Sequence, residues 1–308
     1  METFNNTAIV AVPTSLNLKL NPPFFSRSYG VLLTFSAKPE DISIKYETQI
    51  SYLKTIEDNK RLFKIDRISE VYINDLPPGR TADQLAYETG KVFYPLIVEV
   101  AFDGSYIGIN NHQEIKQRWI LVKQNVLSYF SGDEVNEYLS QTENTIYDEF
   151  ALDICFQTDF FINTFFSPIY QNYGESRTLI RNSFLSLVAQ MPPIEMEINT
   201  QLAAETNHYG AMEIEQNGKE IVNDENLSFN AIYSANFVLD IKTRSIESLL
   251  ANYQWQDGEK HEVDIKVFRI DEGQIHQQQN IDGADNLIFL DPVYNEGKKG
   301  FFKNLFKK

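Results

Sequence analysis

The chain has 308 residues, of which 43% are hydrophobic and 23% charged, so it can build a large core and is not a disordered segment. Its formal charge is −16, and because five of its 27 basic residues lie in the last eleven positions, residues 1–297 carry −21. A body of this charge repels phosphate backbones, which argues against nucleic-acid binding.

The first part of the chain predicts β-structure. Residues 1–40 hold only short strands, of which the apolar run 30–36 is the clearest. Two long runs rich in β-forming residues, 42–56 and 61–75, are joined by a four-residue polar turn. Runs of this kind with a short polar connection predict a β-hairpin.

Helices are predicted next, around a second hairpin. Thr81 opens a capping box, and strand 95–102 then turns back at Asp103-Gly104. Asn111 predicts the start of a helix with one buried stripe, formed by Ile115, Trp119, Val122, Val126 and Tyr129. Further helical segments follow at 133–141 and 144–166, and the second is apolar on nearly every side.

The last part predicts a meander of about six strands. An irregular or helical segment is expected to about residue 188, and strict alternation begins at 194–202. Asn217-Gly218 and Asp257-Gly258 predict hairpin turns, and 233–241 alternates between them.

This order predicts an α+β fold with a large twisted antiparallel sheet and a central helical block. We expect an N-terminal segment with short strands (1–40), hairpins with the helical block (41–190), a meander packed with them as one large domain (191–296), and a basic amphipathic tail (297–308). Two sub-domains dividing near 170–190 are the alternative.

Signatures of catalysis are missing from the sequence. The four histidines form no metal-binding pattern, and neither GxGxxG nor GxSxG occurs. Cys155 lies in an apolar run, where a buried hydrophobic role is expected. The acidic residues of 148–159 are expected to form a solvated helix edge or to contact the basic tail. We therefore predict a protein that is not an enzyme and has no metal or cofactor.

The apolar segment 150–166 has two interpretations. It is a core helix between the sheet and other helices, or it encloses with the curved sheet a cavity for an apolar, lipid-like ligand. In the second case the ligand-binding residues would be Phe156, Phe160, Phe161 and Phe165.

The C-terminal tail combines positive charge with apolar side chains. On a helix its four apolar residues share one face. Docking on its own acidic body, entry into a groove on a partner protein and contact with an anionic membrane are all open. The predicted partner-binding residues are Lys298, Lys299, Phe301, Phe302, Lys303, Leu305, Phe306, Lys307 and Lys308.

The main functional prediction is therefore a binding or adaptor protein whose tail engages a partner protein. The N-terminus lacks the basic and long apolar regions of a secretory signal, so a cytoplasmic location is expected. The alternatives are a carrier or sensor of a small apolar ligand and peripheral attachment to a membrane.

Overall fold

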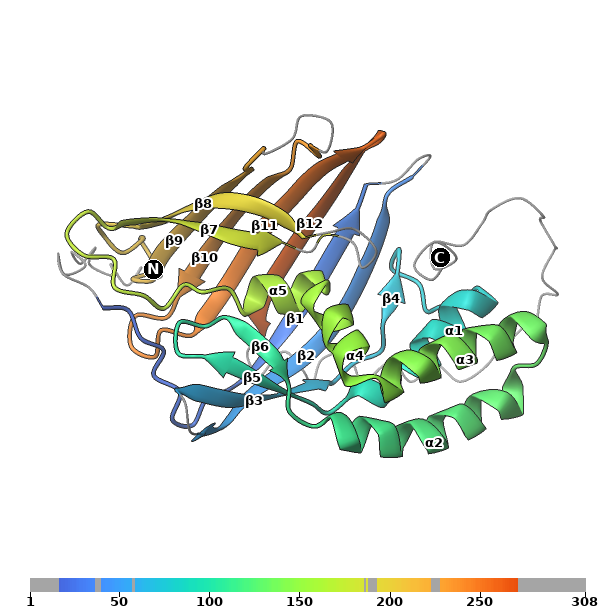
Figure 1. The fold of residues 1–308 in the computed structure, drawn as a ribbon. Helices are drawn as coiled ribbons and strands as arrows, with labels where there is room; N and C mark the ends of the chain where they lie inside the picture. The colour runs from blue at the N-terminus through green and yellow to red at the C-terminus, as the bar shows by residue number, and fades with distance from the viewer. Residues whose placement is uncertain are drawn as a thin grey trace, which may run out of the picture.

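The computed structural model describes residues 17–36, 40–56, 59–185, 187, 193–222 and 228–270. Within these ranges twelve strands form one antiparallel sheet, accompanied by five α-helices and one 3₁₀ turn (Figure 1). The elements in chain order are β1 (Ser26–Phe35), β2 (Ile42–Ile56), β3 (Lys60–Arg67), β4 (Tyr72–Ile73), α1 (Thr81–Gly90), η1 (Lys91–Phe93), β5 (Leu96–Ala101), β6 (Tyr106–Ile109), α2 (His112–Tyr129), α3 (Asp133–Tyr147), α4 (Glu149–Gln157), α5 (Phe160–Phe165), β7 (Thr178–Leu185), β8 (Ile194–Leu202), β9 (Met212–Glu220), β10 (Ile232–Leu239), β11 (Ile246–Asp257) and β12 (Glu259–Ile270).

The sheet follows the order β6-β5-β3-β2-β1-β12-β11-β10-β9-β8-β7, and β4 pairs with β2 beside this path. β1 lies between β2 and β12, so the N-terminal hairpins and the C-terminal meander belong to one continuous sheet. β6 and β7 are its two edges. The sheet is strongly curved, and Figure 1 shows both edge strands close to α5 on the concave side.

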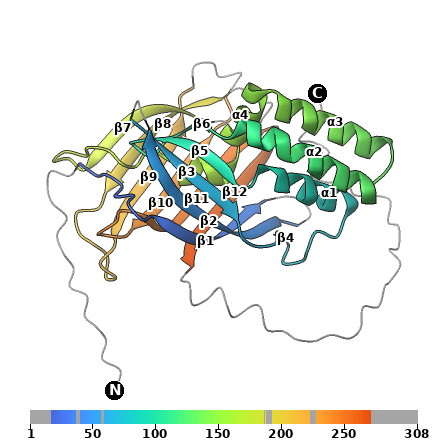
Figure 2. The ribbon, with the colours of Figure 1, turned by 90° about the horizontal axis from the view of Figure 1, so that it is seen from below.

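The predicted α+β class and the large antiparallel sheet are confirmed, whereas the central helical block is not. Only α4 and α5 enter the concavity, while α1, α2 and α3 pack on one another beside the sheet (Figures 1 and 2). Each of these helices carries one buried stripe, which suits a position at the border of the molecule. The outer face of α2 also exposes Ile120, Leu121 and Leu127. In α2, Tyr129 falls outside the stripe and is 87% exposed.

Aromatic side chains of α5 fill the concavity. Phe165 packs edge-to-face on Tyr29 of β1, with ring centroids 5.1 Å apart, and Phe161 packs on Tyr46 of β2 at 6.1 Å. Phe160 meets Tyr253 of β11 at 5.3 Å. Such pairs stabilise beyond their buried area by about 0.5–1.5 kcal/mol each, so α5 acts as a wedge against central strands that are distant in sequence but close in the sheet.

The predicted helix 144–166 is interrupted twice, and acidic residues cause both breaks. Asp148 caps α4 by accepting hydrogen bonds from the amides of Phe150 and Ala151 (3.0 and 3.1 Å). Asp159 caps α5 by accepting from the amide of Ile162 (2.8 Å). Aspartate favours this capping role over the helix interior. These two residues of the acidic cluster are therefore helix caps, not parts of one solvated edge.

Burying the charged Asp159 carboxylate costs stability, and a neutral substitution can remove this cost. Burial raises the pKa of this carboxyl, although the Ile162 amide and the Arg67 guanidinium oppose the shift. As pH rises above about 4, the unfolded chain therefore loses this proton before the folded chain does, and the contribution to stability falls. Asparagine keeps the cap without the charge.

We therefore expect Asp159→Asn to be at least as stable as the natural chain at pH 7, and Asp159→Ala to lose about 1 kcal/mol. Urea unfolding of the three proteins at pH 7 and pH 4 measures both effects. Equal losses in the two variants would show that the carboxylate charge itself is needed.

The hairpins β2–β3, β5–β6 and β11–β12 are confirmed, as are the alternating strands β8 and β10. The turn predicted at Asn217-Gly218 is wrong, because both residues lie inside β9. A Cβ atom at Gly218 would stand 3.3 Å from atoms of Ile198 and Tyr233. This glycine therefore serves close packing across three strands. Cys155, predicted to be buried, is exposed on α4.

Candidate functional site

A cavity of about 240 Å³ lies where the two edges of the sheet approach α5, and we call it the edge cavity. Its walls come from β6, from the end of α4, from α5 and the segment after it, and from β7, β8, β10 and β11, whose positions are labelled in Figure 1. The lining residues are Ser105, Tyr106, Gln157, Asn163, Phe166, Ser167, Pro168, Arg181, Ser183, Phe184, Leu185, Ile198, Tyr233 and Tyr253.

Arg181 supplies the positive charge of the edge cavity. It projects inward from the edge strand β7, and its Nε atom is buried with no hydrogen-bond partner among the described residues. No carboxylate of the described residues forms an ion pair with the Arg181 guanidinium. Burial lowers the pKa of the guanidinium and the Asp103 carboxylate, acting at longer range, opposes the shift. Arginine stays charged in proteins, so a cation with one buried and unpaired donor lies in the wall of the cavity.

The tyrosines of the opposite wall are neutral and already hydrogen-bonded. Burial raises the pKa of Tyr253 to about 12, and its hydroxyl lies 2.8 Å from the Thr164 hydroxyl. Tyr233 donates to the Gln216 side-chain oxygen at 3.0 Å, and Ser167 donates to the same oxygen at 3.1 Å. These groups hold the wall in place, and the hydroxyl oxygens retain capacity to accept hydrogen bonds.

A second polar group joins β6 to α4 at the rim. The Tyr106 hydroxyl donates to Asp153 Oδ1 at 2.7 Å, and Gln157 Nε2 donates to Asp153 Oδ2 at 2.9 Å. Burial, followed by the hydrogen bond to Asp153, raises the pKa of Tyr106. The Asp153 charge is thus engaged by two donors and does not compete for Arg181.

The remaining lining is apolar. Phe166, Pro168, Leu185 and Ile198 bring ring and aliphatic carbon atoms to the cavity beside the polar groups. The volume is several times that of a water molecule, about 30 Å³, and approaches the lower end of small-ligand pockets, about 300 Å³. The chemistry of the edge cavity is therefore one cation, several neutral hydroxyl and amide groups, and an apolar wall.

None of the four phenylalanines predicted as ligand contacts lines the edge cavity. Phe156 packs on Phe93 at 5.4 Å, and Phe160, Phe161 and Phe165 form the wedge described above. Phe165 also borders a second space of about 20 Å³, which is close to the size needed for one water. Their neighbour Phe166 is the ring that reaches the edge cavity.

The other predicted site lies outside the described residues. The partner-binding tail, Lys298, Lys299, Phe301, Phe302, Lys303, Leu305, Phe306, Lys307 and Lys308, falls entirely in that part of the chain. Its role in binding a partner protein or an anionic membrane stays a prediction.

The residue that sequence reasoning missed is Arg181. The segment 178–185 lies in the stretch that was predicted to be helical or irregular to about residue 188, whereas it forms a strand with apolar residues on both faces. Leu179 and Leu185 point inward, while Ile180 and Phe184 alternate with them and are more than half exposed, although Phe184 also borders the edge cavity. The only sequence signal for this residue is a strand-like segment with an arginine on its inward face. A single sequence does not distinguish such a segment from a strand whose arginine faces solvent.

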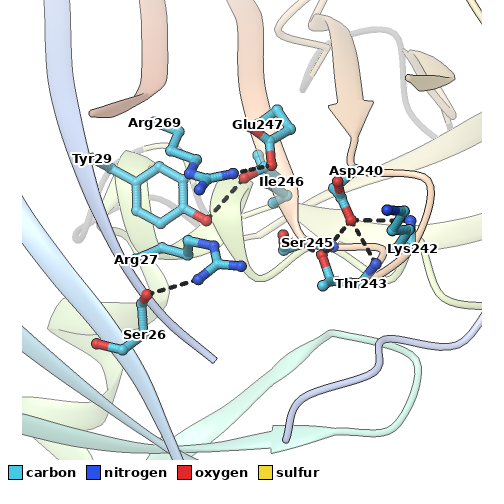
Figure 3. Close-up of polar contacts among 10 residues, drawn as sticks. All are labelled: Ser26, Arg27, Tyr29, Asp240, Lys242, Thr243, Ser245, Ile246, Glu247 and Arg269. Carbon is cyan, nitrogen blue, oxygen red and sulfur yellow. Dashed lines mark hydrogen bonds and ion pairs between the residues drawn. The ribbon is translucent and has the colours of Figure 1, made fainter. Parts of the chain in front are cut away.

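A second basic cluster lies at another part of the sheet and makes structural contacts, although the Nε atom of Arg27 is also buried without a hydrogen-bond partner among the described residues. Figure 3 shows the Arg269 guanidinium pairing with Glu247 at 2.7 Å, and the Tyr29 hydroxyl donating to the Ile246 carbonyl at 2.9 Å. Arg27 lies below the Tyr29 ring and donates to the Ser26 carbonyl. Asp240 in the neighbouring turn accepts from Lys242 and Thr243. These contacts fix the β10–β11 turn against β1.

The described residues hold no group of three or more histidine, cysteine or acidic side chains placed to bind a metal. Across the same ranges, every helix is too short or too polar to serve as a transbilayer segment.

Comparison with known proteins gives little further information. No model of a known protein family matches the chain, and no curated protein matches it significantly. The chain resembles a solved structure on lipid–protein interactions in lipovitellin, with a TM-score of 0.45 and 10% sequence identity. The match covers 80% of this chain and 25% of the lipovitellin chain. A resemblance of this size carries no argument about function, so the site is interpreted from its own residues.

Proposed function

We propose that the protein is a carrier or sensor that holds a small amphipathic acid in the edge cavity. The observation that carries this proposal is the Arg181 Nε atom, buried beside the cavity without a partner. A buried donor on a charged group is costly when it stays unpaired, commonly by 1–3 kcal/mol or more. A ligand carboxylate would satisfy it and would use the fork geometry of the guanidinium.

The charge of the ligand follows from the charges around the site. One guanidinium compensates one negative charge, while Asp103 and a chain of net charge −16 oppose a second. A monocarboxylate therefore fits better than a phosphate group, which carries between one and two charges near neutral pH.

The shape of the ligand follows from the mixed lining. Arg181 and Ser183 stand two residues apart on the inward face of β7, so both can reach the same head group. Phe166 and Ile198 offer an apolar surface for a short hydrocarbon chain. This proposal differs from the predicted carrier of an apolar, lipid-like ligand, because polar groups form a large part of the cavity lining and the predicted phenylalanines lie outside it.

The proposal is tested by calorimetric titration with hexanoate, hexanol and hexyl phosphate at pH 7. Hexanoate is expected to bind most tightly, because only it combines a single charge with the short chain. Hexanoate at 100 times its dissociation constant should add about 2.7 kcal/mol to the free energy of unfolding. Equal affinity for hexanol would contradict the role of Arg181, and absence of binding by all three would refute the proposal.

The adaptor function predicted from the tail is a separate proposal and rests on the sequence alone. Its charge and apolar face support contact with a partner protein, and it does not compete with ligand binding by the folded part.

A further inference from the structure

The edge strand β7 has one side without a partner strand among the described residues. It pairs only with β8 there, whereas the opposite edge, β6, receives a contact from the segment after α5, in which the Tyr106 amide donates to the Phe166 carbonyl at 3.1 Å. An open edge of eight residues offers main-chain groups to another strand, and proteins commonly block such edges.

The hydrogen-bond register shows which residues of β7 face outward. The Leu202 amide donates to the Arg177 carbonyl, and the Ile221 amide donates to the Glu195 carbonyl, both at 2.8 Å. Antiparallel ladders alternate with a period of two, so β7 uses residues 179, 181, 183 and 185 toward β8. The main-chain groups of 178, 180, 182 and 184 therefore point away from the sheet.

The side chains at this edge suit pairing with another strand of low charge. Ile180 and Phe184 are 65% and 67% exposed, with Asn182 between them on the same face. β7 contains no acidic residue although the whole chain carries −16. The nearest carboxylate on this face belongs to Glu195 of β8, and it accepts a hydrogen bond from the Asn182 side chain at 3.2 Å. A second copy of β7 can therefore approach without placing carboxylates of the two β7 strands opposite each other.

We infer that β7 pairs with β7 of a second copy of this chain, in antiparallel orientation about a two-fold axis at Asn182. In this register Ile180 lies opposite Phe184 of the second copy, twice by symmetry, and Asn182 lies opposite itself. Arg181 then faces Ser183 of the second copy. Centring the pair on Arg181 instead would place the two guanidinium groups opposite each other, and like charges in that position are unfavourable.

The dimer does not rest on the ligand proposed above. It joins two sheets into one continuous sheet and places the two edge cavities on either side of the same seam, because Arg181 and Ser183 line the cavity from this strand. The main-chain groups at the seam would be paired, as in other proteins that add a strand to a sheet edge.

Asn182→Pro tests the interface without altering the β7–β8 ladder, because the amide of residue 182 points away from β8. Sedimentation velocity should show a dimer of the natural chain at about 100 µM, and the variant should raise the dissociation constant at least tenfold. Ile180→Lys should have the same direction of effect, while Leu250→Lys, on the exposed face of the central strand β11, should leave the dimer unchanged. Circular dichroism confirms that each variant is folded.

The register is tested by cross-linking in a Cys155→Ser background. Asn182→Cys should form a disulfide between two copies, since directly opposed hydrogen-bonded residues have Cα atoms about 5.5 Å apart. Leu250→Cys is the matched control and should remain reduced. A natural chain that stays monomeric at all concentrations, or a dimer unaffected by Asn182→Pro, would overturn the inference.

Discussion

Arg181→Met is expected to weaken hexanoate binding by about 10- to 100-fold, which corresponds to the loss of one charge-assisted hydrogen-bonded pair of about 1.5–3 kcal/mol. The same variant should be as stable as the natural chain or more stable by about 1 kcal/mol, because methionine fills similar space without a buried charge. Opposite effects on binding and stability are typical of a residue retained for function. Calorimetric titration and urea unfolding measure the two quantities on the same samples.

Two controls separate charge from shape at this position. Arg181→Lys keeps the charge but loses the fork, so it should retain part of the affinity for hexanoate and little of the preference over hexanol. Arg177→Met removes a nearby guanidinium that donates to the Ala203 carbonyl and does not line the edge cavity. Its hexanoate affinity should stay within about twofold of the natural value, since this guanidinium does not line the cavity and solvent and salt weaken its effect there. A stability loss in Arg181→Met without a binding defect would show that Arg181 is structural.

Phe165→Ala is expected to lower the free energy of unfolding by about 3–5 kcal/mol, the range for truncating a buried phenylalanine. Phe165 is buried among the rings of Tyr29, Phe161 and Phe166, at centroid distances of 5.1, 5.5 and 5.2 Å. Its removal opens a void at the centre of the wedge that joins α5 to β1. Urea unfolding monitored by circular dichroism provides the measurement.

The matched control is Phe150→Ala, which removes the same side chain from α4 at a position 74% exposed. It should change stability by no more than about 0.5 kcal/mol. The pair distinguishes a structural wedge from a ligand-lined void, the two interpretations that the apolar segment 150–166 allowed. Similar small losses in both variants would mean that the concavity is not tightly packed and that Phe165 borders a larger space.

The parts of the fold that could be predicted from the sequence are those where one face of a strand is buried. In β10 the alternation of Tyr233, Ala235, Phe237 and Leu239 predicts the strand and its inward face correctly. The β11–β12 turn was also predicted correctly from the Asp257-Gly258 pair. In the structure Gly258 adopts the positive φ that such a turn requires.

The errors occur where local signals and tertiary contacts disagree. Asn217-Gly218 has the composition of a turn, yet Gly218 is needed under Tyr233 and stays inside a strand. Asp148 and Asp159 each lie between two helices and cap the second one. Because both residues lie in or beside a long apolar segment, the sequence predicts one continuous helix there. Arg181 escaped notice because its strand forms an edge with apolar residues on both faces. The candidate site depends on the meeting of β6, α5 and β7, and this meeting of distant segments is not encoded in any local pattern.

The most direct test of the central claim is the ¹⁵N–¹H signal of the Arg181 Nε–H group during titration with hexanoate. This signal, assigned by its loss in Arg181→Met, is predicted to shift and saturate with the calorimetric dissociation constant, while hexanol leaves it unchanged. Saturable hexanoate binding with an unmoved Arg181 signal would place the ligand elsewhere and contradict the account.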